Sequence, residues 1–341
     1  MHRFLKPFLT CGTALLLAGP ALAFEAGWRQ IRIAGASPEI QATTVALYYP
    51  TQAPARAITM GPFTVTVAPD AAPVSKFKGL IVLSHGTGGS ELGHSRLAES
   101  LARAGYLVAA LRHPGDNWQD RSLLSVSAEH YFGERPRQVS GVIDALLRDP
   151  EWQDRIGRDA RGPWVGAVGH SAGGYTVLAL AGGQPDVSRL ATHCAAERAD
   201  DPIFCRTGRA AEPGAAASTT PPASAPSTDP RLRAVVALAP VGVVFTAESL
   251  AAIQLPVAVY EAEQDRWLVP RFHTGWIASN LPGAELHRVP NAWHFAFMDT
   301  PSMAIPSEDG DIRADPPGFD RSAFLQRLAV EVPAFFDKAF K

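Results

Sequence analysis

The sequence has no excess of charge of either sign. Its 341 residues include 31 Lys and Arg against 33 Asp and Glu, which gives a formal net charge of −2. Such a balance produces no long-range field that would attract nucleic acid or another polyion. We therefore expect a neutral or small binding partner and no nucleic acid.

Motifs for common cofactors are also missing. No group of His, Cys, Asp and Glu has the spacing of a metal site. The glycine-rich stretch His85-Gly86-Thr87-Gly88-Gly89 lacks the Lys-Ser/Thr ending of a nucleotide-binding P-loop, and the dinucleotide-binding pattern is absent. The sequence thus predicts no metal and no cofactor.

The first 23 residues have the pattern of a signal peptide. His2, Arg3 and Lys6 precede an apolar stretch, and Ala21-Leu22-Ala23 is a small-x-small cleavage site. The alternative, an uncleaved membrane anchor, is disfavoured because the apolar stretch is shorter than about 18 to 20 residues. We expect export to the periplasm or the medium, and a mature chain that begins near Phe24 without a stable membrane anchor.

Export changes the interpretation of the cysteines. In an oxidising compartment Cys194 and Cys205 can form a disulfide that closes one short loop. The alternative is two buried free thiols, but the surrounding segment is polar. We expect the disulfide.

Strand and helix patterns alternate along most of the chain. Residues 24–78 alternate apolar and polar side chains in the manner of an antiparallel meander of leading strands. After them, apolar runs predict strands over 80–83, 106–113, 163–171, 232–240, 255–265 and 284–295. Helical spacing predicts helices over 93–106, 135–149, 175–183, 270–281 and 320–340, the last kinked or restarted at Pro333. This order predicts a single α/β domain over 24–341, with a mostly parallel, doubly wound sheet and helices on both faces.

One interval interrupts this alternation. Residues 184–230 form an insertion with a short polar, helix-compatible part, followed by an Ala/Pro/Ser-rich segment over 210–230. That segment has too few apolar side chains to offset the entropy of ordering, so we expect a flexible insertion. The alternative is a lid over a binding site.

The stretch Gly169-His170-Ser171-Ala172-Gly173 lies between an apolar strand and an apolar helix. A serine hydroxyl reacts only when it projects from a tight turn, and small flanking residues allow that turn. The following helix directs its positive end and its free N–H groups toward the serine. We expect Ser171 to be a nucleophile.

The partners of such a serine follow from the order of the chain. The backbone N–H of Ala172 and that of Thr87, in the loop after the first parallel strand, are the expected oxyanion hole. The acid and then the histidine should each follow a later strand, which indicates Asp265 and His294. Glu261 and Glu263 are the alternative acids. His273 and His287 fall within predicted elements, and we assign them structural roles.

These motifs resemble those of a known superfamily. The stretches LSHGTGG, RHPGDN, GHSAGG, AEQDRWLVP, WHFAF and ADPPGFDR, spread over residues 80–321, are similar to those of α/β-hydrolases. Within them the chain resembles bacterial proteins called predicted dienelactone hydrolases, relatives of platelet-activating-factor acetylhydrolases and lipase-like polyester hydrolases. The resemblance implies Ser171 as nucleophile, His294 as base, Asp265 as its partner, and Thr87 with Ala172 as oxyanion hole. It departs at the insertion and at Ala172, where some relatives carry a bulky aromatic residue.

The expected reaction is hydrolysis of a small-molecule carboxylic ester through an acyl-enzyme intermediate. An amidase or peptidase would use the same triad, and a non-catalytic binding protein on a hydrolase fold is the alternative outside enzymes. Trp118, Trp293 and Phe295, with Phe297, are candidates to line an apolar pocket, although such aromatic side chains also serve as simple core.

Overall fold

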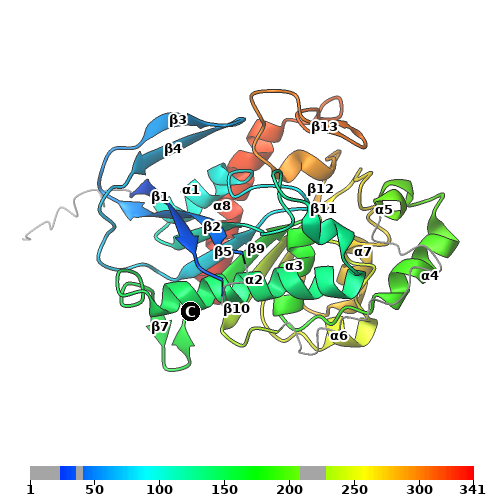
Figure 1. The fold of residues 1–341 in the computed structure, drawn as a ribbon, viewed down its shortest axis with the longest axis horizontal. Coiled ribbons are helices and arrows are strands. Elements are labelled where there is room, and N and C mark those ends of the chain that lie inside the picture. The colour runs from blue at the N-terminus through cyan, green and yellow to red at the C-terminus, as the bar shows by residue number, and fades with distance from the viewer. Residues whose placement is uncertain (1–23, 36–40, 208–227) are drawn as a thin grey trace, which may run out of the picture.

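The computed structural model describes residues 24–35, 41–207 and 228–341 (Figure 1). The predicted signal peptide and most of the Ala/Pro/Ser-rich segment lie outside these residues. Within the described part, no helix is both long and apolar enough to cross a bilayer.

A ten-stranded sheet forms the centre of the molecule, with strand order β12-β11-β10-β9-β5-β6-β2-β1-β4-β3. The six strands from β12 to β6 run parallel to one another. The apolar runs of the five inner strands are buried on both faces, as the continuous hydrophobic stretches predict, whereas the edge strand β12 is largely accessible. Their bounds are Leu80–Ser84 (β5), Leu107–Arg112 (β6), Val165–His170 (β9), Leu232–Leu238 (β10), Val257–Ala262 (β11) and Glu285–Val289 (β12).

The leading strands form one edge of this sheet and are not a simple meander. Their bounds are Glu25–Ile33 (β1), Thr43–Thr51 (β2), Arg56–Met60 (β3) and Phe63–Pro69 (β4). β1 pairs antiparallel with β2, which joins β6, while β4 returns parallel to β1 and forms a hairpin with β3. The meander prediction was wrong here because strand spacing along a chain does not determine which neighbour a strand pairs with.

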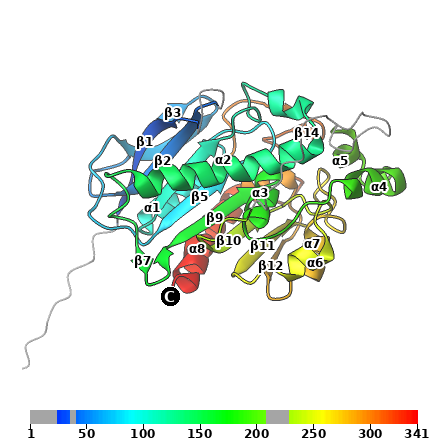
Figure 2. The same cartoon turned by 60° about the horizontal axis from the view of Figure 1, so that its bottom comes forward.

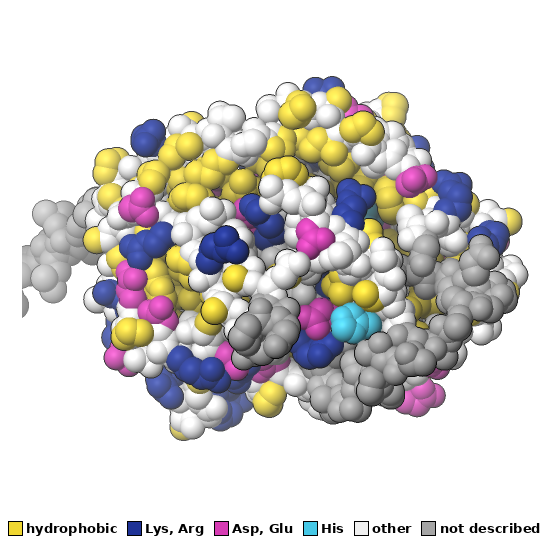
Figure 3. Space-filling view, viewed as in Figure 1, with side chains coloured by type: hydrophobic (Ala, Val, Ile, Leu, Met, Phe, Trp, Pro, Cys, Tyr) yellow, Lys and Arg dark blue, Asp and Glu magenta, His cyan; other side chains and the backbone are white. Residues whose placement is uncertain are grey.

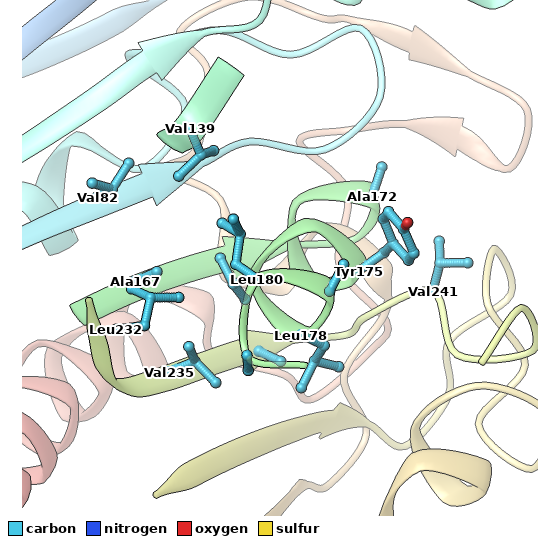
Figure 4. Packing of buried hydrophobic residues seen from close by; sticks show 14 of the residues in the cluster. Val82, Val139, Ala167, Ala172, Tyr175, Leu178, Leu180, Leu232, Val235 and Val241 are labelled. Atoms are coloured by element: carbon cyan, nitrogen blue, oxygen red, sulfur yellow. The ribbon is translucent and has the colours of Figure 1, made fainter. Parts of the chain in front are cut away.

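Helices cover both faces of the sheet (Figure 2). Ser95–Arg103 (α1) and Arg321–Ala339 (α8) pack on one face. The other face carries Ala128–Arg148 (α2), Ala172–Leu180 (α3), Ala247–Ala251 (α6) and Thr274–Asn280 (α7). Figure 4 shows Leu178 and Leu180 of α3 on the side of the strand residues Ala167 and Val235, and Tyr175 beside Val241. The two-sided arrangement is that of the predicted doubly wound sheet.

Both long helices continue through an internal proline. α2 begins at Ala128, capped by the Ser127 side chain, and continues through Pro136, whereas the prediction began it at 135. α8 continues through Pro333 as one helix and does not restart there. A proline inside a helix costs about 3 kcal/mol. Burial of the neighbouring Val332 and Phe336, both fully inaccessible, offsets that cost in α8.

The described part of the insertion is helical, with Ser188–Glu197 (α4) and Pro202–Arg206 (α5). Both helices lie at the right-hand end of Figure 1, away from β1 and β2. Cys194 in α4 and Cys205 in α5 are joined by a disulfide with a Cα–Cα distance of 5.4 Å. The predicted disulfide is thus present, and it links two helices across the short turn between them.

The remaining elements are short. They are Ser122–Ser125 (η1), Arg158–Asp159 (β7), Gly162–Pro163 (β8), His294–Phe297 (η2), Pro306–Ser307 (β13) and Gly310–Asp311 (β14). Figure 3 shows basic and acidic side chains intermixed over one face of the molecule, as the balanced charge predicts, with apolar side chains gathered toward the top of the view.

Candidate active site

Ser171 lies in the sharp turn between β9 and α3. Its backbone has φ 59° and ψ −119°, a conformation that L-residues rarely adopt. The turn is held in place because the Ser171 N–H donates to Leu238 O at 2.9 Å and its carbonyl accepts from the N–H groups of Tyr175 and Val241. Such strain persists only where the surrounding structure enforces it, and it is typical of functional positions.

The two glycines of the motif are required by close backbone approaches. A Cβ at Gly169 would lie 2.0 Å from Gly173 O, and a Cβ at Gly173 would lie 2.0 Å from Ser84 O. Any larger residue at either position would push α3 away from β5 or β9. The G-x-S-x-G spacing therefore follows from how tightly the turn packs on the sheet.

His294 and Asp265 contact each other although they are 29 positions apart in the sequence. The Nδ1 of His294 is 2.6 Å from Oδ2 of Asp265, and both side chains are nearly inaccessible to solvent. The other carboxylate oxygen, Oδ1, accepts the backbone N–H groups of Trp267 and Leu268, each at 2.8 Å. Because an ionised carboxylate only accepts hydrogen bonds, His294 carries its proton on Nδ1 and its Nε2 is free to act as a base.

The histidine is tied to the serine turn through the backbone. His170, directly before Ser171, donates from Nε2 to the carbonyl of His294 at 3.0 Å, and the two rings are 4.8 Å apart. Ser171, His294 and Asp265 therefore belong to one connected unit at the carboxyl ends of β9, β11 and β12.

The alternative acids have other partners. Glu261 pairs with Arg288 at 3.3 Å, and Glu263 accepts the backbone N–H of Asn291 at 3.1 Å. His287 lies in β12 and stacks on Tyr260. None of these side chains bonds to His294, so Asp265 is the acid that the structure brings to the histidine.

The loop after β5 passes directly beside the serine. A Cβ at Gly86 would lie 3.1 Å from the Ser171 Cβ. Thr87 follows and is exposed, with its hydroxyl 3.0 Å from that of Tyr131. Among the described residues, neither the Thr87 N–H nor the Ala172 N–H has a hydrogen-bond acceptor. Both N–H groups lie on backbone segments next to Ser171, and their role as oxyanion donors stays a prediction.

Comparisons with known proteins agree with this architecture. No family model and no curated protein matches the chain. A ferulic acid esterase from Streptomyces cinnamoneus superposes with a TM-score of 0.61 at 22% identity, covering 94% of this chain and 92% of that one. A dienelactone hydrolase from Anabaena variabilis has a TM-score of 0.51 at 14% identity, covering 93% and 100%. This chain has an α/β-hydrolase fold. The fold prediction is confirmed.

In this α/β-hydrolase fold the four candidate pocket aromatics separate into two groups. Trp118 is 59% exposed, and its backbone N–H donates to Gly89 O in the loop that carries Thr87. Trp293 and Phe295 flank His294 and are partly accessible. Phe297 differs, because it is 1% exposed and packs on Phe324 in the core. Phe297 is therefore a core residue.

A second buried cluster involves the insertion. His193 and His273 each place Nε2 at 2.9 Å from Oδ2 of Asp201. The Nδ1 of His273 accepts the backbone N–H of Gly242, so the ring proton lies on Nε2 and donates to Asp201. A metal held by that Nε2 would need the proton on Nδ1 instead. The cluster is better explained as a hydrogen-bonded anchor of α4 and α5 on the α/β-hydrolase fold than as a metal site.

One prominent group beneath the Thr87 loop, the buried ion pair between Asp116 and Arg135, was not predicted from the sequence. Although burial alone would raise the pKa of Asp116, the nearby charge of Arg135 lowers it below its ordinary value. Burial, and then the charge of Arg135, lower the pKa of His85 to about 4. The only sequence signal for this ion pair was the stretch RHPGDN, which contains Asp116 and is similar to a stretch of α/β-hydrolases.

Proposed function

We propose that the protein is a serine hydrolase that cleaves small carboxylic esters through an acyl-enzyme intermediate. The observation that carries the proposal is the hydrogen bond between His294 and Asp265, in a unit connected to the strained turn at Ser171. A nucleophile, a base and an orienting acid in this relation are the parts that acyl transfer needs.

Each group has a role that its hydrogen bonds support. His294 Nε2 takes the proton of the Ser171 hydroxyl, which then attacks the ester carbonyl. The imidazolium that forms is stabilised by Asp265, itself held by two backbone N–H groups. The N–H groups of Thr87 and Ala172 bind the oxyanion, and water later releases the acyl group from Ser171. This route uses no metal and no cofactor.

Esters are preferred over amides because two solved structures that share the fold are described as a ferulic acid esterase and a dienelactone hydrolase. Trp118, Trp293 and Phe295 keep accessible apolar surface that suits an apolar acyl or alcohol group. Export to the periplasm or medium belongs to the same proposal, and the Cys194–Cys205 disulfide supports it.

The test uses purified mature protein with p-nitrophenyl esters of graded chain length. Ser171→Ala is expected to abolish turnover and also labelling by a fluorophosphonate. Asp265→Asn should lower kcat by about 10³- to 10⁴-fold, because it removes the acceptor that fixes the His294 tautomer. Glu263→Gln is the matched control, since this carboxylate lies two residues away and does not bond to His294.

The outcomes separate the competing functions. Equal turnover by the wild-type protein and Ser171→Ala would remove Ser171 from the mechanism. Labelling of Ser171 by the fluorophosphonate without turnover of any ester would favour an amide substrate. Absence of both labelling and turnover would favour a non-catalytic binding protein.

A further inference from the structure

A charged pair lies buried beneath the loop that carries Thr87. Asp116, in the loop after β6, and Arg135, in α2, are both fully inaccessible and form an ion pair. Replacing such a pair with well-packed apolar side chains is often neutral or stabilising, because both charges must leave water. Stability alone therefore explains this pair poorly, and its hydrogen bonds indicate another purpose.

Asp116 holds the loop at its outer part. Its Oδ1 accepts the backbone N–H of Gly88 at 2.8 Å, and its Oδ2 accepts both Arg135 and the hydroxyl of Tyr131, the latter at 2.8 Å. The same Tyr131 hydroxyl lies 3.0 Å from the hydroxyl of Thr87. One carboxylate thus fixes the backbone on the far side of Thr87, and a phenol fixes the Thr87 side chain.

Arg135 holds the beginning of the same loop and also the nucleophile helix. Its Nη2 donates to the carbonyl of His85, before Gly86 and Thr87. Its Nε donates to the hydroxyl of Thr176 at 3.2 Å, and that hydroxyl donates to the carbonyl of Ala172 at 2.8 Å. A single rigid guanidinium therefore connects the two backbone segments that offer the oxyanion N–H groups.

We propose that Asp116, Arg135 and Tyr131 are positioning residues that set the separation of the Thr87 and Ala172 N–H groups. This inference rests on the proposed function, since it concerns the same oxyanion site. None of the three side chains needs to touch the substrate. They act by holding two backbone donors in place before the reaction, which is how an oxyanion hole gains its effect.

The test compares three variants with one matched control. Asp116→Asn removes the negative charge and replaces one carboxylate oxygen with an NH₂ group, beside the donors Arg135 and Tyr131. Arg135→Lys keeps the positive charge but loses the planar guanidinium. Tyr131→Phe removes one hydroxyl. The control is Asp315→Asn, because Asp315 also pairs with a buried arginine, Arg321, through hydrogen bonds of 2.8 to 3.0 Å.

The readouts are kcat, KM and the rate constant for phosphonylation of Ser171. Asp116→Asn and Arg135→Lys should lower kcat and the phosphonylation rate by about 10- to 100-fold while KM stays within about threefold, because a misplaced donor acts on the transition state. Tyr131→Phe should show a smaller loss in the same direction. Asp315→Asn should lower the melting temperature and leave kcat unchanged.

A double variant protects the test against misfolding. Asp116→Asn combined with Arg135→Met removes both buried charges, so it should recover stability relative to the single variants. If the pair positions the oxyanion donors, kcat stays low in this stable protein. Recovery of kcat together with stability would overturn the inference, as would single variants that fold and retain wild-type kcat. A wild-type protein that neither turns over esters nor reacts with the phosphonate would instead overturn the proposed function.

Discussion

Reduction of the Cys194–Cys205 disulfide should destabilise the protein measurably without altering its folded shape. The two cysteines are separated by 11 positions, so the bond closes a short loop in the unfolded chain. For a loop of this length, the lost chain entropy corresponds to about 3 kcal/mol at room temperature. In the folded state the hydrogen bonds of His193 and His273 to Asp201 remain, so the geometry of α4 and α5 should survive reduction.

Urea denaturation of the mature protein with and without a thiol reductant measures this effect. Reduction removes no atoms from the core, so the change in the free energy of unfolding reports the crosslink itself. The Cys194→Ala/Cys205→Ala variant is the control, because its denaturation curve should not respond to reductant. Equal unfolding free energies for the oxidised and reduced wild-type protein would refute the entropic reasoning.

Two further predictions concern burial and close packing. Burial lowers the pKa of His94 to about 3, and neither of its ring nitrogens has a partner among the described residues. The unfolded chain takes up this proton near its ordinary pKa of about 6.5, so stability is full above that pH and falls as the pH decreases toward 4. Urea midpoints across this range should show the fall. His94→Leu should make it shallower without removing it, because burial also lowers the pKa values of His85, His113 and His170; an unchanged slope would contradict the assignment. Gly173→Ala should prevent folding or abolish activity, since its Cβ would lie 2.0 Å from Ser84 O. Gly141→Ala, in α2 with no atom within 4 Å of its Cβ, should instead raise stability by about 0.5–1 kcal/mol, and soluble yield with a melting curve distinguishes the two.

The sequence predicted the parallel part of the fold well because the signals there are local. Apolar runs such as Leu80–Ser84 are buried on both faces, and the helical spacing of residues in α1 reports one packed side. Helix α3 is apolar throughout, and all of its residues are buried. The leading strands over 24–78 were predicted, but their pairing was not. Pairing depends on which edges meet in space, and that information is not contained in any single segment.

For the candidate site, the sequence by itself determined the serine turn and the order of acid and histidine after it. Its glycines and apolar flanks require a tight strand-to-helix turn at Ser171 in any version of this fold. Only the tertiary structure decided that Asp265, rather than Glu261 or Glu263, meets His294, and that Arg135 joins the two oxyanion segments. Side chains that are close in sequence on a strand and its loop point in different directions, so they meet different partners. Side chains far apart in sequence come together because the sheet order brings the carboxyl ends of separate strands to one edge of the sheet.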